Sequence, residues 1–478
     1  MGERISVKEL DRLPVPDEAE VDRLLQAEIQ KSGRKLVVLD DDPTGVQTVH
    51  DVSVYTSWDE AAMTEGFREP GRIFYILTNS RGMTREETIR VHREILASAE
   101  AASRATGKDY AIISRSDSTL RGHFPLEGEV LREGLEKLGH PVDGEILLPY
   151  FREGGRFTLN DIHYVQYGDE LVPAADTEFA KDRTFGYQHS DLPGYIEEKT
   201  KGAYPAAGVV RISLEDLRAM ELEKMTAQLM GVTDFGKVCV NCAKDIDVKV
   251  FCIALYRALS QGKRFLFRTA AAFVKAVGGI SDRPLLTRAD MVTLENGNGG
   301  VIVVGSHTAK TTAQLSELLK LPELVPVSFR SSAVLEGPEA FDAEVARCVA
   351  EEEKIIRSGR TSVCFTERKV LDLPGDTPEA ALERSVRISD GVQRMVADLR
   401  ETPAFIIAKG GITSSDVGTK ALRVRRADVL GQIRPGVPVW RTGAESRFPG
   451  TPYVIFPGNV GQVETLREAA QILLGQEV

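Results

Sequence analysis

The sequence predicts an α/β protein of two domains, each built on a mainly parallel sheet, with a cleft between them. Short apolar stretches, such as residues 36–39 and 405–408, alternate with amphipathic stretches of helical spacing. This is the pattern of parallel strands joined by crossover helices. Residues 280–300 lack periodicity and end in a Gly/Asn run, which is typical of a domain boundary. We therefore predict one domain over residues 1–285 and a second over residues 298–478.

The composition is that of an ordinary globular protein and disfavours two classes of partner. Of the 478 residues, 42% are hydrophobic and 27% are charged, and the formal net charge is −11. Non-specific nucleic-acid binding requires a basic face, so we expect no nucleic-acid partner. No apolar run reaches the ~20 residues of a transmembrane helix, and the first residues have no signal-peptide core. We expect a cytoplasmic protein with no membrane partner.

The five cysteines are sparse in this long chain, which indicates reduced thiols. Cys239 and Cys242 form the single Cys-x-x-Cys pair. A redox or metal site at this pair is the alternative to a place in a buried strand, but an isolated pair is a weak signal. We predict no metal site built from protein ligands.

In the first half, helices and strands alternate from the N-terminus. Residues 19–31 have apolar side chains at helical spacing. Thr84 and Glu87 have the spacing of a capping box, which predicts a helix that continues to about residue 97. Residues 151–205 lack this rhythm, so we expect a lid or an insertion that contributes to a site. Strands are predicted at residues 36–39, 74–77, 110–114 and 145–151, and strand–loop–helix units at residues 208–217, 236–255 and 263–279.

Polar side chains that suit a small hydroxy acid follow the first four strands. They include Asp41, Asp42, Thr44, Asn79, Arg115, Asp117, Arg121 and Arg156, and Gly45 belongs to the turn after the first strand. Arginine pairs with a carboxylate through two hydrogen bonds. Aspartate and asparagine suit hydroxyl groups, and one aspartate could take the proton of an attacking alcohol. Any one of these residues could instead belong to a structural ion pair. Their clustering after successive strands favours a sugar-acid pocket.

Three strand-to-helix turns dominate the second half, at residues 301–315, 405–422 and 453–466. In a parallel sheet they would lie at the carboxyl edge, where backbone N–H groups and helix N-termini favour phosphate. The alternative is three helix caps that bind nothing. Neither a Rossmann fingerprint nor a Walker A sequence is present. The neutral donors in these turns include Ser306, Gly410, Gly411, Thr413, Gly458, Asn459 and Gly461. Further strands are predicted at residues 325–329 and 362–365, and a long helix at residues 381–399.

Six motifs together resemble those of the four-carbon acid sugar kinases. They are DDPTG (41–45), RSDSTLRG (115–122), the GGRFT…HYV block (154–165), GSHTAKTTAQL (305–315), AKGGITSSDVG (408–418) and PGNVG (457–461). The resemblance extends over about residues 36–474. It implies a sugar-acid-binding N-terminal domain and a nucleotide-binding C-terminal domain. The implied reaction is ATP-dependent phosphorylation at the 4-hydroxyl of threonate, erythronate or a 3-oxo-tetronate. Phosphoryl transfer of this kind usually requires Mg²⁺.

The resemblance also implies roles for individual residues. The residues that would contact ATP are Ser306, Gly410, Gly411, Ile412, Thr413 and Gly458. The residues that would line the acid side are Asp41, Asp42, Arg115, Asp117 and Arg121. Asp41 or Asp42 would be the base or orient the hydroxyl, and Arg115 and Arg121 would hold the carboxylate or the transferring phosphoryl group. We predict that Asp41, Asp42, Arg115 and Asp117 are catalytic and that Thr44, Gly45, Asn79, Arg121 and Arg156 bind the acid.

Two departures from the family pattern concern the identity of the acid. This chain has Arg115 where family members commonly have lysine, and Arg268-Thr269-Ala270-Ala271 where they often have Gly-Ser-Ala-Gly. Two other functions stay open: a nicotinamide-dependent dehydrogenase or isomerase of sugar acids, and a non-catalytic sensor of a sugar acid or nucleotide. A homodimer is also compatible with the sequence.

Overall fold

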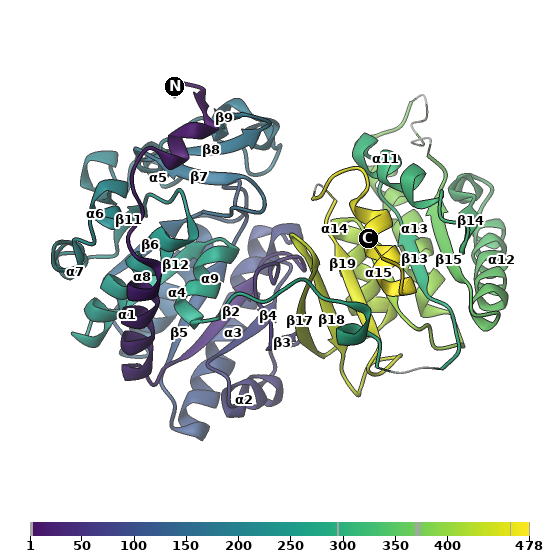
Figure 1. Cartoon of the computed structure of the whole chain (residues 1–478), viewed down its shortest axis with the longest axis horizontal. Coiled ribbons are helices and arrows are strands. Elements are labelled where there is room, and N and C mark those ends of the chain that lie inside the picture. The colour runs from purple at the N-terminus through teal and green to yellow at the C-terminus, as the bar shows by residue number, and fades with distance from the viewer. Residues whose placement is uncertain are drawn as a thin grey trace. The chain divides into compact units, whose positions relative to one another are not determined.

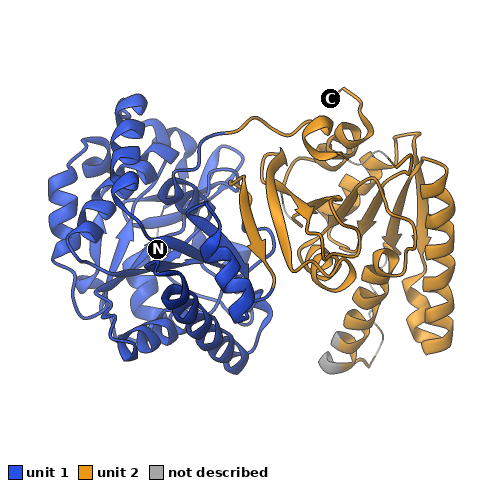
Figure 2. Cartoon of the chain, turned by 90° about the horizontal axis from the view of Figure 1, so that it is seen from below, with its two compact units in different colours: residues 1–45, 57–282 blue, residues 46–56, 283–478 orange. Residues whose placement is uncertain are grey.

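The chain folds into two compact units, which Figure 2 distinguishes by colour. The computed structural model describes residues 3–293, 296–368, 371, 373, 375–458 and 460–477. One unit comprises Met1–Gly45 and Ser57–Asp282, and the other comprises Val46–Thr56 and Arg283–Val478. The predicted first domain, residues 1–285, therefore needs a correction, because residues 46–56 belong to the second unit. Strand β3 (Val52–Tyr55) lies in this segment and pairs antiparallel with β17 (Arg426–Arg434), a long-range contact that no local sequence pattern reveals.

The first unit is built on a parallel sheet. Its strand order is β10 (Val210–Ile212), β11 (Gly236–Val240), β6 (Gly144–Leu148), β12 (Phe265–Thr269), β5 (Tyr110–Arg115), β2 (Lys35–Asp40) and β4 (Ile73–Leu77). All six neighbouring pairs are parallel. The chain passes from β2 to β4 on one side and then to β5 on the other, so the strand order reverses between β2 and β5. Ligands of open α/β sheets bind at the carboxyl ends of the strands at such a point.

The helices of the first unit form two groups, and within each group neighbouring helices pack against one another (Figure 1). One group contains α2 (Glu60–Arg68), α3 (Arg85–Thr106) and α4 (Leu126–Lys137); the other contains α1 (Glu18–Lys31), α6 (Leu214–Arg218), α7 (Leu222–Met230), α8 (Asp245–Ser260) and α9 (Ala271–Gly278). The capping box of Thr84 and Glu87 is confirmed. Helix α3 runs beyond residue 97 because its buried stripe continues through Ala99 and Ala102 to Gly107, which ends it with φ +68°.

Residues 151–205 form an ordered insertion rather than an irregular connection. They contain β7 (Arg156–Leu159), β8 (Ile162–Tyr167), β9 (Glu170–Pro173) and α5 (Leu192–Lys199), joined in part by a 3₁₀ turn, η4 (Glu178–Lys181). The three strands form an antiparallel sheet with β1 (Ile5–Ser6). Figure 1 shows this small sheet apart from the parallel sheet of the same unit.

The second unit combines parallel and antiparallel strands. Its strand order is β3, β17, β18 (Val437–Thr442), β19 (Pro452–Phe456), β16 (Ile406–Lys409), β13 (Val301–Val304), β15 (Thr361–Thr366) and β14 (Leu324–Phe329). The pairs from β19 to β14 are parallel, and the pairs from β3 to β19 are antiparallel. The strand order reverses between β13 and β16. The α/β class with mainly parallel sheets is therefore confirmed, although the predicted strands do not include the β17–β18 hairpin.

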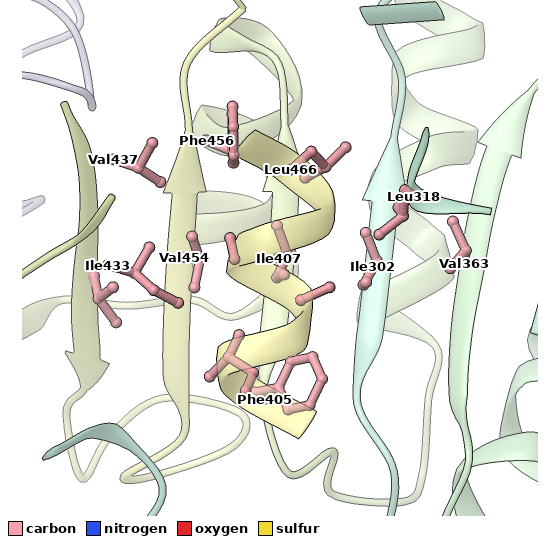
Figure 3. Packing of buried hydrophobic residues seen from close by; sticks show 14 of the residues in the cluster. Ile302, Leu318, Val363, Phe405, Ile407, Ile433, Val437, Val454, Phe456 and Leu466 are labelled. Atoms are coloured by element: carbon pink, nitrogen blue, oxygen red, sulfur yellow. The ribbon is translucent and has the colours of Figure 1, made fainter. Parts of the chain in front are cut away.

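Helices cover the parallel part of this second sheet. They are α10 (Arg288–Met291), α11 (Ala309–Leu318), α12 (Pro338–Arg357), α13 (Pro378–Ala397), α14 (Gly411–Asp416) and α15 (Thr465–Leu474). Figure 3 shows Leu466 of α15 and Leu318 of α11 packed against Ile302, Ile407 and Val454 of the strands. Burial of these aliphatic side chains, each worth roughly 1.5–3 kcal/mol, fixes the helices on the sheet.

Candidate functional site

Three consecutive aspartates end β2 at the reversal point of the first sheet. The side chains of Asp40 and Asp41 are 1% and 6% exposed, and that of Asp42 is 22% exposed. Arg115 Nη1 lies 3.5 Å from Asp40 Oδ1 and 3.8 Å from Asp41 Oδ1. Burial raises the pKa of both Asp40 and Asp41. A Cβ atom at Gly45 would lie 1.9 Å from the Asp40 carboxylate, so this turn folds back onto β2 only with glycine.

Arg81 joins the aspartates from the turn that follows β4. Its Nη2 and Nε donate to the two oxygens of Asp41 at 2.7 and 3.2 Å, and its Nη1 donates to Asp42 Oδ2 at 3.3 Å. Thr44 donates through its backbone N–H and its hydroxyl to Asp42 Oδ1. Burial alone would raise the pKa of Asp42, but Arg81 and Thr44 outweigh it and lower that pKa. Asn79, with φ +54°, donates its backbone N–H to the carbonyl of Asp40 at 3.4 Å.

The loop after β5 adds a second carboxylate–guanidinium pair. Arg121 Nε donates to Asp117 Oδ2 at 2.7 Å, and the hydroxyl of Thr119 also donates to this oxygen. Burial would raise the pKa of Asp117, but Arg81 and Arg121 outweigh it and hold that pKa far below its ordinary value. Asp117 is therefore ionised and is a poor proton acceptor. Because Arg81 acts electrostatically on Asp117 as well as on Asp41, the loops after β2, β4 and β5 form one charged site.

The insertion brings a further guanidinium to this site. The guanidinium carbons of Arg121 and Arg156 lie 5.1 and 5.3 Å from the ring centre of Phe179, which belongs to η4. Arg156 Nε is buried and has no hydrogen-bond partner in the described part of the chain. Burial lowers the pKa of Arg156, and Asp117 partly offsets that effect. Two stacked guanidinium groups with spare donors suit a carboxylate ligand.

In the second unit, the three predicted turns lie together at the carboxyl ends of adjacent strands. Strands β19, β16 and β13 are neighbours. Gly410 has φ +121°, and a Cβ atom there would lie 3.4 Å from Ser306 Cβ and from Thr413 Oγ1. The N–H of Gly410 donates to the carbonyl of Phe456 at 2.9 Å. Gly411 and Gly458 have no other atoms within 4 Å of a hypothetical Cβ, so a ligand could approach their backbone closely.

Lys409, which ends β16, gives this cradle a buried positive charge. Its side chain is fully buried, its Nζ donates to the carbonyls of Pro457 and Gly458, and it lies 4.6 Å from the ring centre of Phe456. No carboxylate among the described residues lies within ion-pair distance of Lys409. Burial, reinforced by Lys310, lowers the pKa of Lys409 to about 7. A buried ammonium without a carboxylate partner is costly and favours an anionic ligand.

A fourth loop, after β15, reaches the same cradle. Arg368 Nη2 donates to the carbonyl of Ser306 and, at 3.0 Å, to Thr312 Oγ1 in the first turn of α11. Its Nε and Nη1 are buried and lack hydrogen-bond partners in the part of the chain that the structure describes. Arg368 thus adds positive charge beside the N-terminus of a helix, where anions are already favoured.

The structure separates the predicted residues into groups. In the first unit, Asp41, Asp42, Thr44, Arg115, Asp117 and Arg121 lie in one network with Arg81, and Arg156 borders it. In the second unit, Ser306, Gly410, Gly411 and Thr413 share the cradle with Gly458, and Ile412 exposes 73% of its surface there. Gly461, with φ +80°, lies against Thr465 at the start of α15. Asn459 lies outside the described residues.

Sequence reasoning missed four residues of these two sites. They are Arg81, Phe179, Arg368 and Lys409. Lys409 lies inside one of the recognised motifs, and Arg81 follows a predicted strand. Their positions in the sequence could therefore have identified both as candidate site residues. Phe179 and Arg368 carry no such signal, because their contacts are made across long sequence separations.

Among the described residues, no helix is long and apolar enough to span a membrane. The same residues contain no cluster of three or more histidine, cysteine, aspartate or glutamate side chains that could hold a metal ion. Cys239 and Cys242 are buried, and burial raises the pKa of both thiols. These thiols lack the exposed, electropositive setting of reactive cysteines.

Two family models match the chain, one over its N-terminal part and one over its C-terminal part. A model described as a sugar-binding N-terminal domain matches residues 36–277, and a model described as a nucleotide-binding C-terminal domain matches residues 301–466. None of the curated proteins compared with the chain matches it.

Two solved structures share the fold. A Haemophilus influenzae protein from a family described as a domain of unknown function has a TM-score of 0.60 and 16% identity; the match covers 91% of this chain and 100% of that chain. A Salmonella typhimurium LT2 protein, provisionally named a tRNA synthase, has a TM-score of 0.64 and 15% identity; the match covers 92% of this chain and 99% of that chain. At these identities the likeness concerns the fold alone.

Proposed function

Because this chain belongs to the four-carbon acid sugar kinase family, we propose that it transfers the terminal phosphoryl group of ATP to the 4-hydroxyl of a four-carbon sugar acid. Threonate, erythronate and 3-oxo-tetronate are the candidate acids. The observation that carries the proposal is the difference in charge between two reversal-point sites. The first unit has paired aspartates and arginines, which suit a polar molecule with hydroxyl and carboxylate groups. The second has positive charge without a paired carboxylate among the described residues, which suits phosphates.

Each side chain of the first site has a role that its contacts support. Arg121 and Arg156 would bind the carboxylate of the acid. Asp42 would accept the hydrogen bond of the attacking hydroxyl, because it is the most exposed of the three aspartates. Its lowered pKa makes it a weak base, but phosphoryl transfer depends mainly on positioning and charge stabilisation. Arg81 would stabilise the charge that develops on the transferring group.

For Arg115 we propose a different role from the one the motif implies. Its side chain is 6% exposed and faces Asp40 and Asp41. We therefore assign it to neutralising these buried carboxylates rather than to binding the acid. Asp117 would orient Arg121 through their 2.7 Å hydrogen bond, and Asp41 would orient Arg81.

The second site would hold ATP through backbone and side-chain donors. Ser306 and the backbone from Gly410 to Thr413 would bind the phosphates, with Gly458 allowing close approach. Lys409 and Arg368 supply the countercharge. Ile412, exposed at the start of α14, offers an apolar surface to the nucleoside.

Mg²⁺ would accompany ATP. The described residues contain no group of three or more carboxylate, histidine or cysteine side chains that could hold the cation. The nucleotide phosphates and water would therefore be its main ligands. When bound, Mg²⁺ neutralises phosphate charge and orients the phosphates.

The test is ADP release with Mg-ATP and a panel of D- and L-threonate, D- and L-erythronate and their 3-oxo forms. The proposal expects ADP release with at least one acid, matched by a phosphorylated acid in the mass spectrum. Thermal stabilisation by an acid without ADP release would contradict a kinase and support a sensor. Acid-dependent reduction of a nicotinamide cofactor would instead support a dehydrogenase.

A further inference from the structure

A buried charged pair lies beneath the acid site of the first unit. Glu127, near the start of α4, is 5% exposed, and Arg268, on β12, is 6% exposed. Arg268 Nη1 lies 3.9 Å from Glu127 Oε2. Burial would raise the pKa of Glu127, but His92, Arg268 and Ser80 outweigh it and lower that pKa. Glu127 is therefore an ionised carboxylate inside the protein.

This pair contacts two loops of the site from below. On one side, Ser80 Oγ donates to Glu127 Oε1 at 2.7 Å, and Ser80 begins the turn that carries Arg81. On the other side, Arg268 Nη2 donates to the carbonyl of Arg121 at 2.8 Å. Glu127 and Arg268 thus connect the backbones that present Arg81 and Arg121.

The loop that carries Arg121 is held at four consecutive carbonyl groups. The carbonyls of residues 118, 119, 120 and 121 accept hydrogen bonds at 2.7 to 2.8 Å from His163, Tyr187, Tyr195 and Arg268, respectively. Leu120 has φ +69°, a conformation that is rare for a branched side chain and persists only when its surroundings impose it. Of these four donor side chains, Arg268 is the one that forms an ion pair reaching the neighbouring turn through Glu127.

We propose that Glu127 and Arg268 are positioning residues that couple the Ser80–Gly82 turn to the Asp117–Gly122 loop and thereby set the affinity of the site for its acid. Neither residue needs to touch the substrates, because Arg121 would bind the carboxylate of the acid and Arg81 would stabilise the transferring group. The kinetic part of this inference rests on the proposed function. Arg268 also begins the stretch in which this sequence departs from its family, so the coupling is a feature of this chain.

The coupling can be separated from local support of one loop by four variants. Glu127→Gln and Arg268→Met each remove one charge of the ion pair. Tyr195→Phe removes the hydrogen bond to the carbonyl of Leu120 and a hydroxyl beside Arg268, but it leaves the ion pair intact. Asp247→Asn is the matched control, because Asp247 is also a buried carboxylate, 1% exposed, paired with a buried arginine, Arg218, but between α8 and α6.

Hydrogen exchange of the ligand-free protein gives the first readout. Glu127→Gln and Arg268→Met are expected to speed exchange about tenfold in peptides covering both residues 79–83 and residues 117–123. Tyr195→Phe should speed exchange only in the second peptide, and Asp247→Asn in neither relative to the rest of the unit. Acceleration confined to one peptide in both charge variants would overturn the coupling. Should Arg268→Met fail to fold, Arg268→Lys replaces it, because lysine keeps the charge but loses the second nitrogen.

Steady-state kinetics give the second readout. Glu127→Gln and Arg268→Met should raise the KM for the acid about tenfold through Arg121 and should also lower kcat through Arg81, because small misplacements of binding and catalytic groups are costly. An unchanged KM with faster exchange in both peptides would overturn the role in acid affinity. If the wild-type protein releases no ADP with any acid, the proposed function fails, and hydrogen exchange, which needs no substrate, still decides the coupling.

Discussion

The two candidate sites lie at the same kind of position in their sheets but differ in how far carboxylates compensate their basic side chains. In the first unit, the arginines of the site face carboxylates: Arg81 faces Asp41 and Asp42, and Arg121 faces Asp117. In the second, Lys409 donates to carbonyl groups and has no carboxylate within ion-pair distance among the described residues. A compensated network is stable without ligand and can orient a small molecule by geometry. An uncompensated buried charge is energetically unfavourable until an anion binds, so the second site favours phosphate through its charge.

The largest effect is expected where the compensated network meets the reacting hydroxyl. Asp42→Asn keeps the shape of the side chain but removes the charge that would orient the hydroxyl, so kcat should fall by about 10²-fold or more. The measurement is ADP release at saturating acid, with the circular dichroism spectrum as a control for folding. If Asp42→Asn and Asp41→Asn both retain turnover within about tenfold of wild type, neither aspartate is the base.

Lys409→Met tests the uncompensated site. Loss of a charge-assisted contact to phosphate should raise the KM for ATP about 10- to 100-fold, while the KM for the acid stays unchanged. An equal rise in both KM values would show that the effect is a general loss of structure rather than a loss of phosphate affinity.

The same lysine predicts a pH dependence. The pKa of Lys409 in the folded protein is about 7, below the ordinary lysine value of about 10.4. The unfolded chain therefore binds more protons between these values, and this group makes the folded protein more stable as the pH rises through that window. ATP affinity should change in the opposite direction, weakening above pH 7 as the ammonium loses its proton. Titration calorimetry from pH 6 to 9 measures the ATP affinity. Lys409→Met should remove the pH dependence that this group gives to the stability and to the ATP affinity.

A smaller effect is expected from Arg156→Lys in the first unit. Lysine keeps the charge but loses the planar group that stacks on Phe179 and could bind a carboxylate through two hydrogen bonds. The KM for the acid should rise about fivefold, with the KM for ATP unchanged. Phe179→Leu is the companion variant and should have a weaker effect in the same direction. No change in either variant would remove Arg156 from the acid site.

The smallest effect on activity is expected from a buried carboxyl that belongs to neither site. Glu352 on α12 is fully buried, and burial raises its pKa well above the ordinary value. The folded protein keeps this proton when the unfolded chain has lost it, so stability from this group falls as the pH rises. Glu352→Gln should leave both KM values within about twofold of wild type. Its Tm should fall less than that of wild type between pH 5 and pH 8; an identical fall would show that Glu352 does not titrate as described.

The local parts of both sites could be predicted from the sequence. A buried strand that ends in Asp40, Asp41 and Asp42 is visible in the sequence, and so are the Gly-rich turns after β13 and β16. Parallel pairing then requires these turns to share one edge. The same reasoning could not assign Arg115, because its position after β5 does not reveal that its guanidinium faces two buried carboxylates rather than solvent.

Long-range contacts account for what the sequence did not predict. Arg81 binds Asp41 and Asp42 from another strand end, and Arg368 binds the carbonyl of Ser306 across 62 positions. The pairing of β3 with β17 likewise joins residues that lie far apart in the chain. Hydrophobic periodicity reports which face of an element is buried, but not the partner that buries it.

The placement of residues 46–56 in the second unit has a consequence for the modularity of this protein. An expression fragment that begins at residue 283 would contain β17 without β3, and would therefore present an unpaired strand edge of the kind that promotes aggregation. A fragment that ends at residue 282 would carry β3 without β17, with which it pairs antiparallel. We therefore expect that no single cut in the chain yields two self-sufficient halves, because the β3 segment groups with the C-terminal half.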